Sequence, residues 1–147
     1  MIGRNIMRYF TVFLIVTGTT AFADHELDHR NIVRGGDLYQ TQCASCHGVN
    51  LEGQPDWQRQ NDDGTLPAPP HDETGHTWHH DNMLLFNYTK FGGTEALAAR
   101  GVTGFNSGMP SFADVLSDDE IWDILAYIRS TWPERIQDIH AARNQLH

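Results

Sequence analysis

Two cysteines and a histidine stand together near the start of the chain, in the pentapeptide Cys43-Ala44-Ser45-Cys46-His47. Residues at positions i and i+3 of a helical turn are neighbours, so both thiols can bond to one flat molecule above that turn. The imidazole that follows can then reach a metal at the centre of the same molecule. This C-x-x-C-H spacing is typical of haem c, with thioether bonds to Cys43 and Cys46 and with His47 as an iron ligand.

The other uses of a cysteine pair explain less of the pattern. The chain has two cysteines in all. A small-loop disulfide is the ordinary role of such a pair in an exported protein, but it leaves the adjacent histidine unexplained. A zinc site of the usual kind draws on a second ligand pair, and no second cysteine pair exists. We therefore predict one covalently bound haem c as the cofactor.

The N-terminus has the pattern of an export signal. Two arginines precede an apolar stretch at residues 9–16, and the sequence Ala-Phe-Ala, which ends at Ala23, supplies a small-x-small cleavage site. The apolar stretch is short for a transmembrane helix, although an uncleaved membrane anchor is the alternative. We expect residues 1–23 to be a signal peptide, residues 24–147 to be the mature protein, and its location to be periplasmic.

The charge of the chain restricts its partners. The formal net charge is −9, and the expected signal peptide contains two arginines and no acidic residue, so the mature protein is still more acidic. Such a protein is poorly suited to nucleic acid or to an anionic membrane surface. We expect partner proteins with a basic docking patch, and contact with a membrane only through partners. The mature length suits one domain.

Helical patterns flank the long middle of the chain. The first predicted helix runs from Ile32 to the cysteine pair, with Gly35, Tyr39 and Cys43 along one face. The last predicted helix opens with a capping box, in which Ser117 caps the helix and Glu120 reaches back. An apolar stripe at helical spacing then follows at Ile121, Ile124, Leu125, Ile128 and Trp132.

Two further segments have weaker helical patterns. Residues 82–91 predict a short helix in the middle of the chain. Pro133 ends or bends the last helix. Beyond it, residues 133–147 are expected to be a polar tail or a short polar helix whose apolar anchors are Ile136 and Ile139.

Taken together, these features resemble class I cytochromes c. In that family a Gly-x-x-x-aromatic face of the first helix crosses the last helix at an aliphatic-x-x-Tyr pair. Gly35 and Tyr39 match the first half of that crossing, and Ile124 and Tyr127 match the second. The resemblance covers most of residues 30–132. It implies an all-α fold in which the N- and C-terminal helices cross around one covalently bound haem.

The resemblance also implies a methionine as the second axial ligand of the iron. Met109 lies in Gly-Met-Pro-Ser-Phe, just before the capping box, and this sequence resembles the family's Met-Pro ligand loop. Met83 is the other methionine of the mature chain, and we interpret it as core packing on the 82–91 helix. A proline after the haem-binding turn usually accepts a hydrogen bond from the proximal histidine. Pro69 is the expected match, although His71 stands where the family pattern Pro-x-Leu has leucine.

A histidine-rich segment has no counterpart in the general family pattern. Its sequence, Gly-His-Thr-Trp-His-His, ends at His80, and similar stretches occur in a subgroup of bacterial exported cytochromes. One hypothesis is a second metal site, for copper or zinc, on His76, His79 and His80. A related one is that a histidine replaces Met109 on the iron. The alternative is that these residues and Trp78 bond to the haem propionates or cap the next helix.

The function that follows is electron carriage without enzymatic activity. A His/Met iron has both axial positions filled, and the thioether favours Fe(II). We expect a periplasmic monohaem carrier of single electrons between redox proteins, either as the haem subunit of a dehydrogenase or as the donor to a terminal oxidase. The alternatives are a copper- or zinc-binding protein with a redox-coupled haem, and a haem enzyme or gas sensor with a displaceable sixth ligand.

Overall fold

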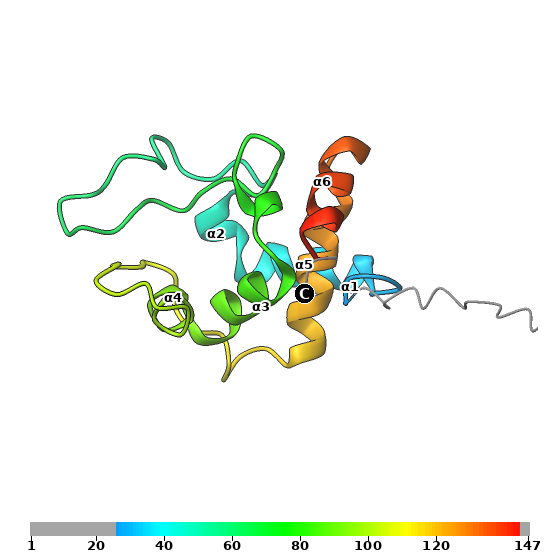
Figure 1. The fold of residues 1–147 in the computed structure, drawn as a ribbon. Coiled ribbons are helices and arrows are strands. Elements are labelled where there is room, and N and C mark those ends of the chain that lie inside the picture. The colour runs from blue at the N-terminus through cyan, green and yellow to red at the C-terminus, as the bar shows by residue number, and fades with distance from the viewer. Residues whose placement is uncertain (1–25, 145–147) are drawn as a thin grey trace, which may run out of the picture.

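The computed structural model describes residues 26–144, and all regular elements in that range are helices (Figure 1). This confirms the all-α prediction. The segment predicted to be a signal peptide lies outside the described residues. In chain order the elements are α1 (Ile32–Gln42), α2 (Ala44–His47), the 3₁₀ helix η1 (Thr77–His79), α3 (Asn82–Phe91), α4 (Gly93–Ala98), α5 (Asp118–Ser130) and α6 (Glu134–Asn144).

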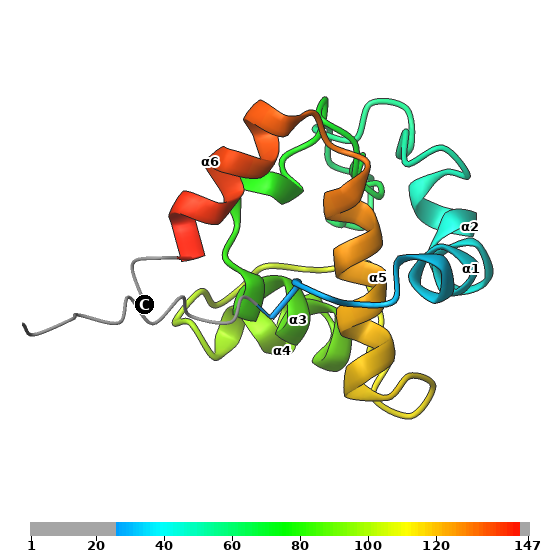
Figure 2. The ribbon, with the colours of Figure 1, turned by 90° about the vertical axis from the view of Figure 1, so that its right-hand side faces the viewer.

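The central packing contact of the fold is the crossing of α1 and α5, which lie against each other in Figure 2. A Cβ atom at Gly35 would overlap the backbone carbonyl of Asp123, so the two helix backbones approach more closely there than a side chain allows. One turn further along α1, the fully buried ring of Tyr39 lies 5.6 Å from the ring of Tyr127. The crossing expected from the Gly-x-x-x-aromatic face is therefore present.

A buried carboxylate ties the start of α1 to the middle of α5. Asp123 is 2% exposed, and its Oδ1 accepts a hydrogen bond from the backbone N–H of Asn31 at 3.1 Å. Its Oδ2 lies 2.6 Å from Nε of Arg34. Asn31 also caps α1, because its side chain accepts from the backbone N–H of Arg34. The sequence does not reveal this role of Asp123, because an aspartate within an amphipathic helix is expected on its polar face.

Helix α5 begins and packs as predicted. Ser117 and Glu120 form the reciprocal capping box, and the hydrogen bonds from Ser117 lower the pKa of the Glu120 carboxyl. The residues of the predicted stripe are all buried: Ile121, Ile124, Leu125, Ile128 and Trp132.

Helix α3 has the predicted bounds, but its exposed face differs from the prediction. Asp81 is the N-cap, and its side chain accepts from the N–H of Leu84, so no histidine caps this helix. Phe86 faces the core, whereas Met83 is 46% exposed. The interpretation of Met83 as core packing is therefore wrong. Met83 lies in the first turn of α3, one turn before Phe86, and its side chain is not covered by the core. Helix α4 was not predicted.

Residues 134–144, expected as a polar tail or a short polar helix, form a helix that packs on the histidine-rich segment. Figure 2 shows α6 beside the segment that contains η1, and the two elements are in contact. Ile136 is buried as expected, but His140 is also fully buried, edge-on to the ring of Trp132 at 5.1 Å. The side chain of Asn144 accepts a hydrogen bond from the N–H of Asn82 at 2.8 Å. The helix is therefore anchored by His140 and Asn144 as well as by the predicted apolar residues.

Two long loops project on the same side of the fold as α2 (Figure 1). One joins α2 to η1 and the other joins α4 to α5. They meet where the side-chain amide of Asn106 donates to the carbonyl of Asp63 at 3.0 Å. Within residues 26–144, no helix combines the length and the apolar character needed to cross a membrane.

Candidate functional site

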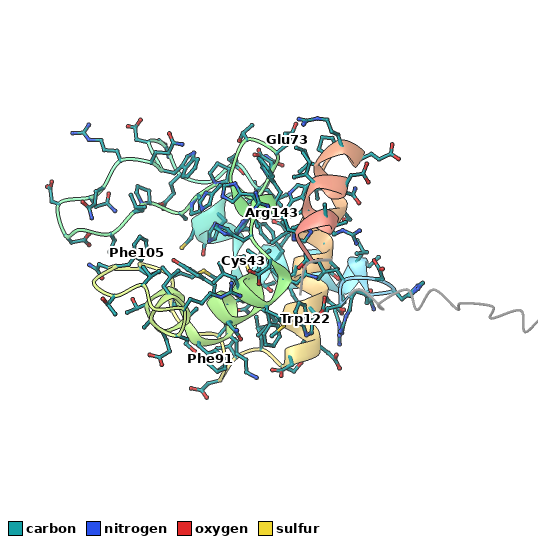
Figure 3. The ribbon with its side chains drawn as sticks, viewed as in Figure 1. Cys43, Glu73, Phe91, Phe105, Trp122 and Arg143 are labelled. Carbon is teal, nitrogen blue, oxygen red and sulfur yellow. The ribbon has the colours of Figure 1, made fainter. Side chains whose placement is uncertain are left out.

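The cysteine pair lies at the junction of α1 and α2. Cys43 is the last turn's cap of α1, and its N–H donates to the carbonyl of Tyr39. Both cysteines are free thiols, with Cys43 half-buried and Cys46 exposed. Burial, and to a smaller extent Cys46, raises the pKa of the Cys43 thiol to about 11, so before haem attachment this group is a neutral thiol. Figure 3 labels Cys43 near the middle of the view and Phe105 on the loop that follows α4.

The imidazole ring of His47 is buried and is oriented by a hydrogen bond to the backbone. Its side chain is buried, at 8% exposed, and its Nδ1 lies 2.8 Å from the carbonyl oxygen of Pro69. A carbonyl only accepts, so Nδ1 carries the proton and Nε2 keeps its lone pair. Burial lowers the pKa of His47, against the opposing effect of the Pro69 hydrogen bond, and this favours the neutral imidazole that binds a metal. Pro69 thus makes the contact that the resemblance implied.

Met109 lies in the irregular segment between α4 and α5, and both its N–H and its carbonyl are hydrogen-bonded. The N–H of Gly93, at the start of α4, donates to the Met109 carbonyl at 3.3 Å. The N–H of Met109 donates to Oγ of Ser107 at 3.2 Å, and that hydroxyl also bonds to the hydroxyl of Tyr88. Its side chain is half-buried. These contacts position the backbone of Met109, while ligation of iron by its sulfur stays a prediction.

The three histidines of the predicted second metal site are neighbours, but they are not arranged as ligands. The ring of His76 stacks on that of Trp57 at 5.1 Å, and its centroid lies 5.5 Å from His79 and 5.3 Å from His80. Among the described residues, no group of three or more His, Cys, Asp or Glu side chains is placed to hold a metal ion. The structure therefore gives no support to a copper or zinc site on His76, His79 and His80.

The other role suggested for this segment was that its histidines and Trp78 bond to the haem propionates. Trp78 donates its indole N–H to the carbonyl of Gly75 at 3.0 Å, so that donor is already used. Nδ1 of His76 is buried without a hydrogen-bond partner, and burial followed by the nearby His79 lowers the pKa of this imidazole. His76 thus has a buried ring nitrogen that no hydrogen bond satisfies.

Sequence reasoning noticed His71 only as a departure from the family pattern. In the structure its ring stacks on that of His47, with ring centroids 4.0 Å apart and planes inclined by 20°. Histidine in place of the family's leucine was the one sign in the sequence that this residue is unusual. The sequence pattern does not show that its ring lies against His47.

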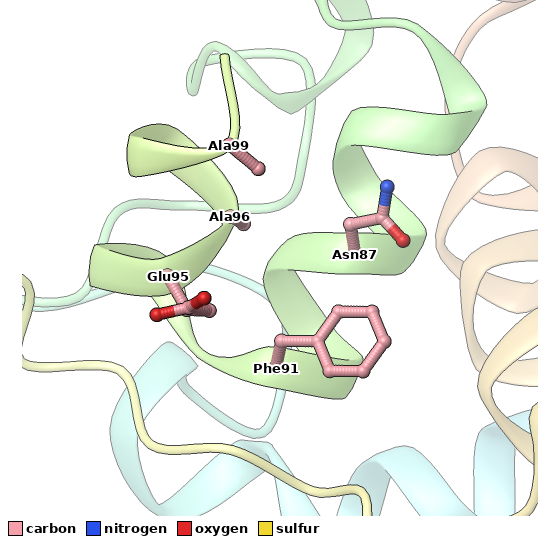
Figure 4. Close-up of a pocket in the computed structure, with 5 residues that line it drawn as sticks. All are labelled: Asn87, Phe91, Glu95, Ala96 and Ala99. Atoms are coloured by element: carbon pink, nitrogen blue, oxygen red, sulfur yellow. The ribbon is translucent and has the colours of Figure 1, made fainter. Parts of the chain in front are cut away.

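A hollow elsewhere on the surface is separate from these residues. It lies between α3 and α4, with a volume of about 250 Å³. Figure 4 shows its lining, which consists of Asn87, Phe91, Glu95, Ala96 and Ala99. None of the predicted haem-binding residues lines it, so this hollow is no part of the predicted haem site.

The comparisons with known proteins agree with the fold and with the pentapeptide. The sequence pattern of the family described as Cytochrome c matches residues 32–132, which is more than half of the chain. The chain therefore belongs to the cytochrome c family. No curated protein and no solved structure matches it. Cytochromes c bind haem c covalently and pass electrons to redox partner proteins, and haem c is accordingly the cofactor of this chain.

The residues present fit that cofactor. The thiols of Cys43 and Cys46 are free, they are three residues apart, and they stand at the start and within the turn of α2. His47 follows them with its Nδ1 bonded to Pro69, which leaves Nε2 as the metal-binding atom. The donor set is thus the one that thioether attachment and axial ligation require.

Proposed function

We propose that this protein is an exported monohaem cytochrome c that carries single electrons between redox proteins, with His47 and Met109 as the axial ligands of the iron. The single observation that carries the proposal is the orientation of His47. A buried neutral imidazole, anchored at Nδ1 by Pro69, is what an iron ligand needs and has no other evident purpose next to two free thiols.

The chain's own residues would set the properties of the redox centre. When bound, haem c supplies a one-electron Fe(III)/Fe(II) couple. The hydrogen bond to Pro69 increases the basicity of His47 and fixes its ring. The thioether of Met109 is a soft donor that favours Fe(II), and it raises the reduction potential above that of a bis-histidine site. With both axial positions filled, there is no open coordination site for a substrate, so we expect no enzymatic turnover.

The position of Met109 supports its assignment over that of Met83. Met109 precedes the capping box of α5 and is anchored to α4 through Gly93. Met83 is followed by leucine and lies on α3, outside the Met-Pro sequence that the resemblance implies for the ligand loop. Met83 therefore serves as a matched control for Met109.

The proposed setting is outside the cytoplasm. An acidic mature protein is suited to a partner with a basic docking patch, and such pairing speeds the encounter of two redox proteins at low salt. The partners proposed are a dehydrogenase, for which the protein would be the haem subunit, or a terminal oxidase that receives its electrons. Cleavage near Ala23 and a periplasmic location complete the proposal.

The test is a comparison of Met109→Ala with Met83→Ala in the haem-loaded protein. We expect Met109→Ala to lower the reduction potential and to let the ferrous form bind CO, because an axial position opens. Met83→Ala should keep the wild-type potential and should not bind CO. A wild-type potential in Met109→Ala would refute the axial assignment, and ready CO binding by the wild-type protein would favour a sensor or an enzyme.

A further inference from the structure

A second imidazole lies directly against the proximal histidine. The His71 ring is parallel to the His47 ring within 20°, and the ring centroids are 4.0 Å apart. This is the separation of two flat rings in van der Waals contact. The residue occupies the place at which the family pattern has leucine, so the flat ring is a property of this chain.

His71 is held in place by four separate contacts. Its N–H donates to the carbonyl of Leu51 at 2.8 Å, and its carbonyl accepts from the indole N–H of Trp132 at 2.7 Å. The ring Nδ1 lies 2.8 Å from the hydroxyl oxygen of Thr77, a residue that is 4% exposed. The ring of Tyr39 meets the His71 ring edge-on at 6.2 Å. A ring with its backbone and one nitrogen bonded in this way cannot turn freely.

The stacked rings also attract each other. Two flat rings at this separation gain dispersion energy from the many atom pairs in contact. His71 therefore acts on His47 as a flat surface in direct contact with it.

The hydrogen bond to Pro69 leaves one motion of His47 unrestrained. A single bond at Nδ1 fixes the direction of one edge of the ring, but the ring can still rock about that bond. A rigid plane at 4.0 Å opposes this rocking, because tilting the ring would drive its atoms into the neighbour. The two contacts together define both the direction and the plane of the imidazole.

We propose that His71 is a positioning residue for the iron ligand His47: its stacked ring, with the Pro69 hydrogen bond, fixes the plane of the axial imidazole. This inference rests on the proposed function, since it concerns the ligand of the haem iron. The plane of an axial imidazole determines how its π orbital overlaps the iron d orbitals. That plane therefore affects the electronic structure of ferric haem, which electron paramagnetic resonance measures directly.

The test compares His71→Leu, which restores the family residue, with His71→Phe, which keeps a flat ring. Both are prepared as the haem-loaded ferric protein, and the g values and the haem methyl proton shifts are measured beside the thermal midpoint of unfolding. We expect His71→Leu to shift and broaden the g values and to reorder the methyl shifts. His71→Phe should stay close to the wild-type protein in both measurements, whatever its thermal stability.

The outcomes separate this inference from the proposed function. If His71→Leu retains the wild-type g values and methyl shifts, the positioning role is refuted, even though the protein is a His/Met cytochrome. If His71→Phe departs as far as His71→Leu, stacking is not the cause and the inference is again refuted. A wild-type spectrum without His/Met character would instead refute the proposed function.

Thr77→Val provides a second test in case His71→Leu fails to accumulate with haem. This substitution removes the hydroxyl at 2.8 Å from Nδ1 of His71 and leaves both imidazoles in place. We expect a broadened g distribution in Thr77→Val, because the His71 ring gains freedom. A distribution identical to that of the wild-type protein would overturn the proposal.

Discussion

The α1–α5 crossing is buried and the segment of residues 71–80 is largely half-buried, and the two regions are specified in different ways. At the crossing, Gly35 and the apolar stripe of α5 act through helical spacing, which is visible in the sequence. In the segment around His71 and His76, the partners come from distant places: Leu51, Trp132 and helix α6. The structure of the first region can therefore be predicted from helical spacing in the sequence. That of the second region depends on contacts with residues far away in the sequence, which helical spacing does not reveal.

The largest effect should come from closing the space at the crossing. Gly35→Val would place side-chain atoms on the carbonyl of Asp123, which is backbone and cannot move aside. We expect a loss of about 3 kcal/mol or more in the free energy of unfolding, measured by chemical denaturation of the haem-loaded protein. Gly36→Ala is the matched control. There a Cβ meets only the ring of Tyr127, at 3.2 Å, and the change should stay within about 1 kcal/mol. Equal losses in the two variants would contradict the close-approach argument.

The buried carboxylate at the same crossing gives the next effect. Asp123→Ala removes the acceptor of the Asn31 N–H and the partner of Arg34. We expect a loss of about 2 kcal/mol, because a part-buried donor is left without its acceptor. Asp119→Ala, which breaks the exposed pair with Arg30, should cost less than about 1 kcal/mol. Similar costs in both would show that burial of Asp123 has no special weight.

A smaller effect tests the second region. Trp132→Phe keeps the apolar ring but removes the N–H that donates to the His71 carbonyl. A loss of about 1 kcal/mol is expected from one hydrogen bond, together with faster hydrogen exchange in the segment around His71. Trp122→Phe is the control, since Trp122 stacks on Phe86 at 4.4 Å through its ring face. If the exchange rates around His71 respond equally to both, the indole bond does not hold this segment.

The sequence predicted the helical crossing and the attachment site because those features depend on short-range spacing. Each of these features can be recognised from a few neighbouring residues: the capping box, Gly35 with Tyr39, and the cysteine pair. Met83 was misplaced because an apolar residue on a short helix has no sign of which face is buried. His71 and His140 were not assigned, since burial of a histidine depends on the elements that cover it. The short helix after Pro133 was one of the two expected outcomes, but its packing through His140 was not predicted, for the same reason.

The last effect is a pH dependence within the histidine-rich segment. Burial, followed by His76 and His79, lowers the pKa of His80 from 6.5 to about 4, while Asp81 opposes this and Arg143 adds to it. The unfolded chain therefore binds this proton more readily, so His80 should cost stability as the pH falls from 6.5 toward 4. Thermal unfolding across that window should be less pH-dependent in His80→Gln than in the wild-type protein. An identical pH profile would show that His80 does not sense its buried surroundings.

The most direct measurement is the visible spectrum of the ferric protein, produced with haem-attachment machinery. The account predicts covalent haem and the weak far-red band of a methionine–iron bond, and it predicts that the band is absent from Met109→Ala and present in Met83→Ala. Covalent haem without that band would contradict the His/Met assignment and would turn attention to His76 or to an open iron. A protein that attaches no haem would contradict the account as a whole.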